Sequence, residues 1–493
     1  MSGSRRSRVA VFGWVLGVGL KIGFAMLAVG VPLAGVWFAS SLAAYFDGPL
    51  WAVLLAGIAC FPAAPLLWDA WATWKRSRRA SVRPRVLTWF DRLVLRTLAV
   101  NLPLVLALLV AYPSTLFTAL SSRGDWMLDD VEAPWAREAR RSLFAVADRM
   151  QWLHELTHPN AYEELIDSEN TGADIVPEPR SRREPGPTEK STKPSEQREP
   201  EPESVDPADL LHEDRWPFRP ELHPVVTSIP AQVETSPTTV ARYIAERESD
   251  PVLRLKALHD YVADRIAYDV AAYESGVFPP QSAEAVFERG TAVCAGYAQL
   301  LQAMGRAVDI EIVVVVGKTR SEDSRGHAWN AAEIDGTWFL LDPTWNAGSV
   351  GDSQFTKRYE TAYFMTPPEV FGLDHFPDDP KWQLREDPVS FGDFLRRPQM
   401  RPDFYAFGFE LVSPDRAVVS AREQVSVVLE NPHGLEVSAA IYQGTTWDGE
   451  STRCPANGSK THFVCPLERP GRHLVVLYGP HRWSMGTLDV QSE

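Results

Sequence analysis

The 493-residue sequence has few cysteines and no excess of positive charge, and both shortages exclude broad classes of protein. Four cysteines, Cys60, Cys294, Cys454 and Cys465, are too few to hold a chain of this length together through a network of disulfides. A formal net charge of -15 argues against a general nucleic-acid-binding protein, which needs a basic surface to meet the phosphates. We therefore expect no nucleic-acid partner, and each cysteine has to be interpreted from its own surroundings.

Apolar residues are concentrated in the first 120 positions, where three runs are each long enough to cross a lipid bilayer, which takes about 20 helical residues. The runs extend over about 22–46, 50–68 and 98–120. The sequence thus predicts a three-span membrane anchor over 1–120, with the lipid bilayer as a partner. A signal peptide cleaved from the start of the chain is the alternative for the first run.

Basic residues orient this anchor, because short segments rich in Lys and Arg stay in the cytoplasm. They precede the first run or separate the second from the third: Arg5, Arg6, Arg8, Lys75, Arg76, Arg78, Arg79, Arg83, Arg85, Arg92 and Arg96. Three spans then place everything after 120 outside the cytoplasm, as in a multi-pass protein of the cytoplasmic membrane if the source is bacterial. Signal-peptide cleavage would leave the same part of the chain outside.

Residues 121–167 are expected to form an amphipathic helical segment, since apolar residues recur there at helical spacing. Within this segment His154, Glu155 and His158 match the H-E-x-x-H pattern of zinc proteases. Pro159 follows directly and pushes His158 out of the helical conformation, so the two histidines do not share a helical face. A chance match at a helix end is favoured, and no metal site is expected.

Residues 168–209 have the composition of a disordered linker. Eight prolines lie between Pro177 and Pro207, among many charged residues and nearly no apolar ones. Such a stretch buries too little apolar surface to offset the entropy that is lost on ordering. We expect an extended tether between the anchor and a globular domain over 210–395.

Cys294 is predicted to lie in the first turn of a helix within this globular domain. Val293, Tyr297, Leu300 and Met304 recur at helical spacing around it. The unpaired N–H groups and the positive end of the helix dipole favour an anion at such a place. The thiolate, which is the nucleophilic form of cysteine, is therefore favoured at this position.

A predicted β-hairpin brings a histidine close to an aspartate. Two strand-like segments, 326–334 and 337–341, flank a two-residue Asp-Gly turn, which is a strong hairpin signal. If the residues that border the turn pair with each other, Trp329 faces Asp342, and His327 lies two positions away on the same face. His327 and Asp342 are then diagonal neighbours about 7 Å apart, within reach of a side-chain hydrogen bond.

A thiol, an imidazole and a carboxylate are the nucleophile, base and orienting group of a catalytic triad, and they make Cys294, His327 and Asp342 the candidate catalytic residues. Gln281 is a candidate donor to an oxyanion, with an exposed position at a helix start as the alternative. Trp329 and Trp345 are candidate walls of the pocket, and core packing explains both equally well. This chemistry requires neither a metal nor another cofactor.

Three ordered segments around these residues resemble the core motifs of the transglutaminase-like superfamily: VCAGYA at 293–298, GHAWN at 326–330 and DPTW at 342–345. The segment after them is similar to the kyphoscoliosis-peptidase subgroup in its YF at 363–364, PP at 367–368, HFP at 375–377 and WQL at 382–384. The resemblance covers about 253–384. It implies an α+β papain-like fold, in which a helix carrying the cysteine packs on an antiparallel sheet carrying the histidine and the aspartate.

Residues 400–493 are predicted to form an all-β, sandwich-like domain, because short apolar segments alternate with turn signals. Cys454 and Cys465 flank the Asn457-Gly458 turn. Outside the cytoplasm they are expected to form a disulfide across a hairpin, with two reduced thiols as the alternative.

The whole sequence favours a membrane-anchored cysteine enzyme that acts by acyl transfer, through a thioester, on peptide or protein amides outside the cytoplasm. Water or an amine can resolve the thioester, and the same triad serves both reactions. We favour hydrolysis of the peptidase kind over cross-linking. The alternative is a non-catalytic scaffold or binding module of the same fold at the cell surface.

Overall fold

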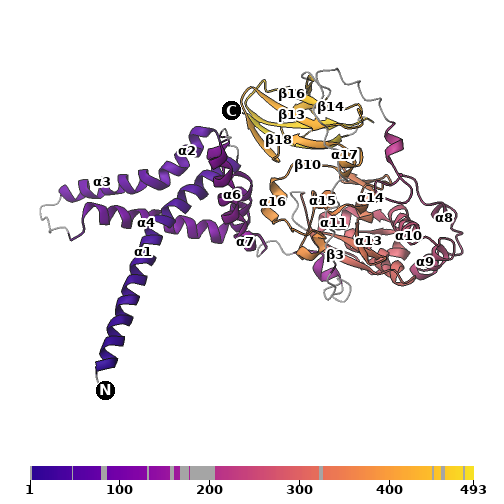
Figure 1. Ribbon diagram of the computed structural model, residues 1–493, viewed down its shortest axis with the longest axis horizontal. Helices are drawn as coiled ribbons and strands as arrows, with labels where there is room; N and C mark the ends of the chain where they lie inside the picture. The colour runs from indigo at the N-terminus through magenta and orange to yellow at the C-terminus, as the bar shows by residue number, and fades with distance from the viewer. Residues whose placement is uncertain are drawn as a thin grey trace, which may run out of the picture. The chain divides into compact units, whose positions relative to one another are not determined.

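The computed structural model describes residues 3–46, 48–78, 86–129, 131, 133–155, 160–166, 177, 206–320, 326–446, 449–456, 461–480 and 484–492 (Figure 1). The chain divides into two compact units, Met1–Thr157 and His158–Ser492, each described here by itself.

All the regular secondary structure described in the first unit is helical. Its elements are α1 (Gly3–Tyr45), α2 (Leu50–Ile58), the π-helical turn η1 (Ala59–Ala63), α3 (Ala64–Ser77), α4 (Trp89–Ala111), α5 (Pro113–Arg123), η2 (Trp126–Leu128), α6 (Pro134–Asp148) and α7 (Gln151–Glu155). Three stretches are long and apolar enough to cross a membrane: Lys21–Tyr45, Leu50–Ser77 and Trp89–Ala111. They agree in number with the predicted runs.

The third stretch is displaced from its predicted place at about 98–120, and that prediction was wrong in its bounds. Pro113 starts a separate helix, so the apolar helix α4 ends at Ala111. At its other end α4 contains Arg92 and Arg96, which the sequence analysis placed in a loop. Both pair with Asp69 of α3, and the Arg92 Nε atom lies 3.1 Å from the Asp69 Oδ1 atom. The shared carboxylate offsets the cost of carrying these charges into an apolar helix.

The amphipathic segment predicted over 121–167 is not one helix. Its described residues include the 3-10 turn η2, the helices α6 and α7, and a second 3-10 turn, η3 (Glu163–Leu165). His154 of the zinc-protease pattern is buried, and its Nδ1 atom lies 2.9 Å from the Ser114 Oγ atom. His158 and nearly all of the predicted linker lie outside the described residues, and the linker's last residues form η5 (Pro207–Leu210).

The second unit begins with helices that cover one face of a five-stranded sheet. The helices are α8 (Pro224–Thr227), α9 (Pro237–Ala245), α10 (Pro251–Arg265), α11 (Val270–Ser275), α12 (Ala283–Arg289) and α13 (Cys294–Arg306). The strands lie in the order β8 (Phe364–Thr366), β5 (Thr337–Leu341), β4 (His327–Ile334), β3 (Ile312–Thr319) and β9 (His375–Pro377). All neighbours in this sheet are antiparallel. The expected helix on an antiparallel sheet is therefore present.

Short elements connect and border this sheet. They are β1 (Ala267–Tyr268), β2 (Thr291–Ala292), α14 (Pro343–Ala347), β6 (Gly348–Gly351), β7 (Gln354–Lys357), α15 (Pro368–Phe371), η6 (Pro380–Gln383) and α16 (Phe391–Arg396). Strands β1 and β2 pair in parallel, which fixes the chain directly before α13.

Strand β4 alternates between the two faces of the sheet, as its sequence requires. Ala328 belongs to the buried cluster that includes Cys294, and the Asn330 Nδ2 atom donates to the Ala298 carbonyl of α13 at 3.0 Å. Trp329 and Ala331 point into a separate cluster on the opposite face. Small residues on one face let α13 lie close to β4. The clusters on the two faces together bury both faces of the sheet at this strand.

The predicted register of the β4–β5 hairpin is confirmed. Ile334 pairs with Thr337, and Asn330 pairs with Leu341. Asp335 and Gly336 form the turn with positive φ values of 51° and 76°. Positive φ at both positions is what a tight type I′ turn requires and what Asp-Gly supplies.

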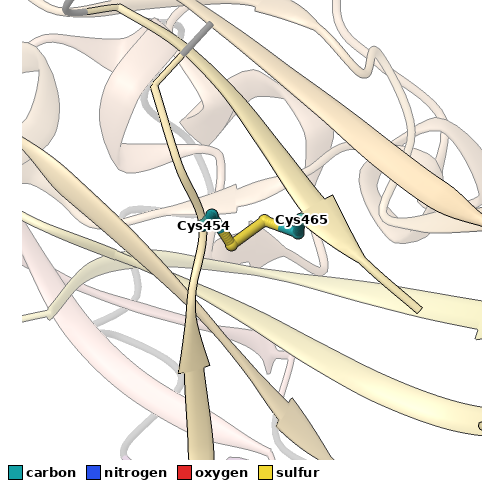
Figure 2. Close-up of a disulfide and its surroundings, with 2 residues drawn as sticks. All are labelled: Cys454 and Cys465. Atoms are coloured by element: carbon teal, nitrogen blue, oxygen red, sulfur yellow. A yellow bond between two sulfur atoms is a disulfide. The ribbon is translucent and has the colours of Figure 1, made fainter. Parts of the chain in front are cut away.

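The C-terminal part of this unit is built from two sheets that share a buried core. One has the order β10 (Gln399–Met400), β18 (Ser484–Ser492), β17 (Gly471–Tyr478), β14 (Ser438–Gln443), β15 (Ser451–Arg453), with β12 (Val418–Ala421) also on β18. The other is β11 (Glu410–Ser413), β13 (Gln424–Glu430), β16 (His462–Pro466), and α17 (Pro402–Ala406) precedes it. Cys454 and Cys465 are joined by a disulfide inside the shared core (Figure 2).

Candidate active site

Cys294 is the first residue of α13, as its surroundings predict, and its side chain is buried, with 1% of the residue exposed. Val293 caps the helix in an extended conformation, and no side chain accepts from the N–H groups of the first turn. The sulfur therefore lies at the positive end of the helix dipole, which favours an anion.

Gln281 binds the backbone directly before α13. Its Oε1 atom accepts from the Val293 N–H at 3.1 Å, and its Nε2 atom donates to the Pro279 carbonyl at 2.8 Å. The residue is buried, so the exposed position considered in the sequence analysis is wrong. Both ends of the Gln281 amide hold backbone, one of them directly beside Cys294.

Asp342 holds His327 through one carboxylate oxygen and the backbone through the other. The His327 Nε2 atom lies 2.7 Å from the Asp342 Oδ2 atom. The Oδ1 atom accepts from the N–H groups of Thr344 at 2.8 Å and Trp345 at 3.2 Å, which caps α14. Asp342 is fully buried, so these contacts fix its position and leave the second imidazole nitrogen of His327 free of this carboxylate.

The charges of this site favour a protonated imidazole. Burial lowers the pKa of His327, but the Asp342 carboxylate and the Cys294 sulfur outweigh burial and raise that pKa to about 9. Burial works to raise the pKa of Asp342, yet His327 and His375 bring it well below its usual range. The thiol, imidazole and carboxylate thus form one electrostatically coupled group, in which the imidazole lies between the sulfur and the carboxylate.

A second histidine contacts the same carboxylate, and sequence reasoning missed it. The His375 Nε2 atom lies 3.1 Å from the Asp342 Oδ2 atom, and its Nδ1 atom lies 2.6 Å from the Asp374 Oδ1 atom. The Tyr363 hydroxyl donates to the Asp374 Oδ2 atom at 2.5 Å. Burial lowers the pKa of His375, and Asp374 together with Asp342 raises it to about 9. The sequence signal that could have revealed this contact is His375 of the HFP segment at 375–377, directly after Asp374. That segment is strand β9, which joins the sheet beside β3.

His327, Asp342 and His375 are also the residues that could share a metal ion, since their ligand atoms lie within 4.8 Å of one another. Two histidines and a carboxylate are a common ligand set. Their mutual hydrogen bonds account for the same arrangement.

A cavity of about 580 Å³ opens beside His327 and gives the site room for a ligand. Its lining includes Trp345 and Tyr363, and the Trp345 ring lies 5.6 Å from the His327 ring. Trp329 is 1% exposed and belongs to the core on the far face of the sheet. Trp345 is therefore the tryptophan that forms the wall, and Trp329 packs behind the imidazole.

Comparisons with known proteins agree with the resemblance stated above. Residues 238–343 match the family model described as the transglutaminase-like superfamily. Kyphoscoliosis peptidase of Mus musculus is 30% identical over 267 residues, which make up 51% of this chain and 37% of that protein. The Homo sapiens protein of the same name is 29% identical over 253 residues, or 48% of this chain and 35% of that protein. The chain thus spans little more than a third of these relatives.

Among solved structures, one described as "Crystal structure of a TGase" is 21% identical, with a TM-score of 0.20, and covers 27% of this chain and 36% of that chain. A likeness of this size carries no argument about function.

Proposed function

We propose that this chain, whose residues 238–343 form a transglutaminase-like domain similar to that of kyphoscoliosis peptidase, is a cysteine enzyme that cleaves peptide or protein amides by acyl transfer. Cys294 is the nucleophile, His327 the acid and base, and Asp342 the group that orients the imidazole. The observation that carries the proposal is the 2.7 Å hydrogen bond between His327 and the buried Asp342, beside a thiol at a helix start.

In the proposed reaction the Cys294 thiolate attacks the amide carbonyl carbon, and the C–N bond breaks as the imidazolium of His327 gives its proton to the leaving amine. The acyl group is then a thioester on Cys294. His327 takes a proton from water, the hydroxide oxygen attacks the thioester carbonyl, and the acid and the thiolate are released. An amine in place of water would give a cross-link, and the peptidase name of the relatives supports water.

We place the enzyme at a membrane, with its second unit on the outer side. Three apolar helices are long enough to span a bilayer, and basic residues such as Lys75 and Arg76 lie at the end of the second. The Cys454–Cys465 disulfide supports an oxidising compartment for the C-terminal sheets, which as a β-sandwich would position the substrate.

One observation favours a second candidate, a non-catalytic binding module of the same fold. The Cys294 side chain is buried, and a covered sulfur cannot attack a substrate. The two candidates differ in the state of the thiol, because a module that only binds has no need of an activated thiolate.

The test is the rate at which iodoacetamide labels Cys294 at pH 6, read by mass spectrometry, in the full chain carrying Tyr162→Ala, because Tyr162 packs against the buried Cys294. An ordinary thiol is almost wholly protonated at that pH, so an activated thiolate reacts about 100-fold faster than an unactivated one. We expect His327→Ala, added to this variant, to remove the advantage and Cys60→Ala, at the other free cysteine, to preserve it. Equal labelling of the Tyr162→Ala chain with and without His327→Ala would overturn the enzyme. A peptide library then distinguishes the two reactions. Hydrolysis creates new peptide ends, whereas cross-linking incorporates a fluorescent amine into the peptides.

A further inference from the structure

Residues 160–166, here called the strap, lie across the start of α13. They come directly before the linker in sequence, yet they belong to the second unit. Tyr162 of the strap is completely buried and packs in the same apolar cluster as Cys294 and Ala298. The strap therefore covers the sulfur that the proposed reaction needs.

Specific hydrogen bonds hold the strap at both ends. The Asn160 Nδ2 atom donates to the Gly317 carbonyl of β3 at 2.8 Å, and Asn160 Oδ1 accepts from the Tyr162 N–H at 3.0 Å. At the other end the Gln299 Nε2 atom of α13 donates to the Leu165 carbonyl at 3.1 Å. These bonds join the strap to the strand and the helix on either side of the thiol.

A glycine makes room for the strap directly before the catalytic histidine. Gly326 has φ of +91°, and a Cβ atom at this position would overlap the Asn160 side chain. The position thus has both a backbone conformation and a space that favour glycine. Asn160 occupies that space, one residue from His327.

The pocket that holds the Tyr162 ring is apolar and largely aromatic. The Phe278 ring lies 5.4 Å from it, and Tyr268, Tyr273 and Ala272 belong to the same cluster. The Tyr162 hydroxyl makes no hydrogen bond of normal geometry within the described residues. Burial, with the Cys294 sulfur as the next cause, raises the pKa of this phenol far above its usual value. The pocket therefore suits an aromatic ring.

We propose that this pocket beside Cys294 is a side-chain pocket of the substrate site, that it takes an aromatic residue of a peptide, and that the strap occupies it in cis as a pseudosubstrate. This inference rests on the proposed function, since it names the substrate class of that site. The enzyme is then latent while Tyr162 is in place. Only 1% of Cys294 is exposed, so a substrate carbonyl cannot reach its sulfur. Release of the strap opens the thiol and frees the pocket together.

The first test compares three variants of the full chain by iodoacetamide labelling of Cys294. Tyr162→Ala empties the pocket, and we expect labelling to accelerate at least tenfold. Tyr162→Phe keeps the ring and should label as slowly as the parent chain, since the ring covers the sulfur. Glu164→Ala, at an exposed strap position, is the matched control and should also change nothing. Unchanged labelling in a folded Tyr162→Ala chain, or fast labelling in Tyr162→Phe, overturns the proposal.

The second test adds a synthetic peptide with the sequence of residues 160–166 to the Tyr162→Ala variant. We expect this peptide to slow labelling at least fivefold, and a peptide with alanine for the tyrosine to fail; equal protection by both peptides overturns the aromatic pocket. Failure of the proposed function can be distinguished from failure of this inference, because His327→Ala in the Tyr162→Ala background measures only whether His327 activates the Cys294 thiol. Fast labelling that depends on Tyr162 but not on His327 supports the strap and overturns the catalytic role of the triad.

Discussion

Two buried networks in the second unit each combine an aspartate with histidine, and the first of them lines the cavity beside His327. The first, called the active cluster after its proposed function, consists of His327, Asp342, His375, Asp374 and Tyr363. The structural cluster consists of Lys256, His259, Asp260, Asn346 and Tyr359. Both central aspartates, Asp342 and Asp260, are fully buried and have a pKa lowered by their partners against the effect of burial.

The two clusters differ in the cation that balances the carboxylate. Asp260 pairs with Lys256, whose Nζ atom lies 2.5 Å from the Asp260 Oδ2 atom. Asp342 is balanced by two imidazoles, whose charge depends on a proton that can leave. A buried ion pair with a fixed cation holds the fold together, whereas a pair with a movable proton beside a thiol can do acid–base chemistry.

The largest expected effect belongs to Lys256→Met, which removes the fixed cation. The Asp260 carboxylate would remain buried without it, and breaking a buried pair costs about 3–5 kcal/mol of stability. We expect faster hydrogen–deuterium exchange of the α10 amides, measured by mass spectrometry. Labelling of Cys294 in the folded fraction, measured in the Tyr162→Ala background, should stay at the rate of the Tyr162→Ala chain. A loss of labelling with unchanged exchange would show that the structural cluster belongs to the site.

Asp342→Asn should have the next largest effect, and on reactivity instead of stability. Asparagine retains an oxygen for the Thr344 N–H, so the cap of α14 survives, but the imidazole loses the charge that keeps it protonated. We expect labelling of Cys294 at pH 6, in the Tyr162→Ala background, to fall on the order of tenfold to 100-fold.

Asp260→Asn is the matched control for that change. Made in the same Tyr162→Ala background, it leaves Lys256 without its carboxylate, so it should destabilise α10 while labelling of Cys294 continues at the rate of the Tyr162→Ala chain. If the two asparagine variants behave alike in both measurements, the distinction between the clusters is wrong.

Local pattern was enough to predict the hairpin and the position of the thiol. The Asp335-Gly336 turn permits one tight register, and that register determines which residues share a face with His327. The helical spacing around Cys294 likewise places it at the first turn of α13. Both inferences concern residues close in sequence, where the period of the side chains determines the geometry.

Contacts between distant segments could not be obtained in that way. His375 lies 33 positions after Asp342, and its strand reaches the sheet through β3, a pairing that no local pattern specifies. Tyr162 is separated from Cys294 by the whole linker, and it was assigned to an amphipathic helix instead of the second unit. Arg92 and Arg96 were taken for loop residues, because their partner Asp69 is on another helix.

The smallest effect, a response to alkaline pH, follows from the same difference in cations. His375 has a pKa raised to about 9, so its contribution to stability is complete below its unfolded value of about 6.5 and is lost as pH rises through about 9. Between pH 7 and pH 10 we expect the parent chain to lose on the order of 1–2 kcal/mol more than His375→Gln, in which the titrating group is gone. Exchange of the β9 amides, corrected for the intrinsic pH dependence of exchange, should report this loss, whereas α10, beside Lys256, should change little. An equal loss in the parent chain and His375→Gln would mean that His375 is already neutral at pH 7, and the active cluster would then hold one movable proton fewer.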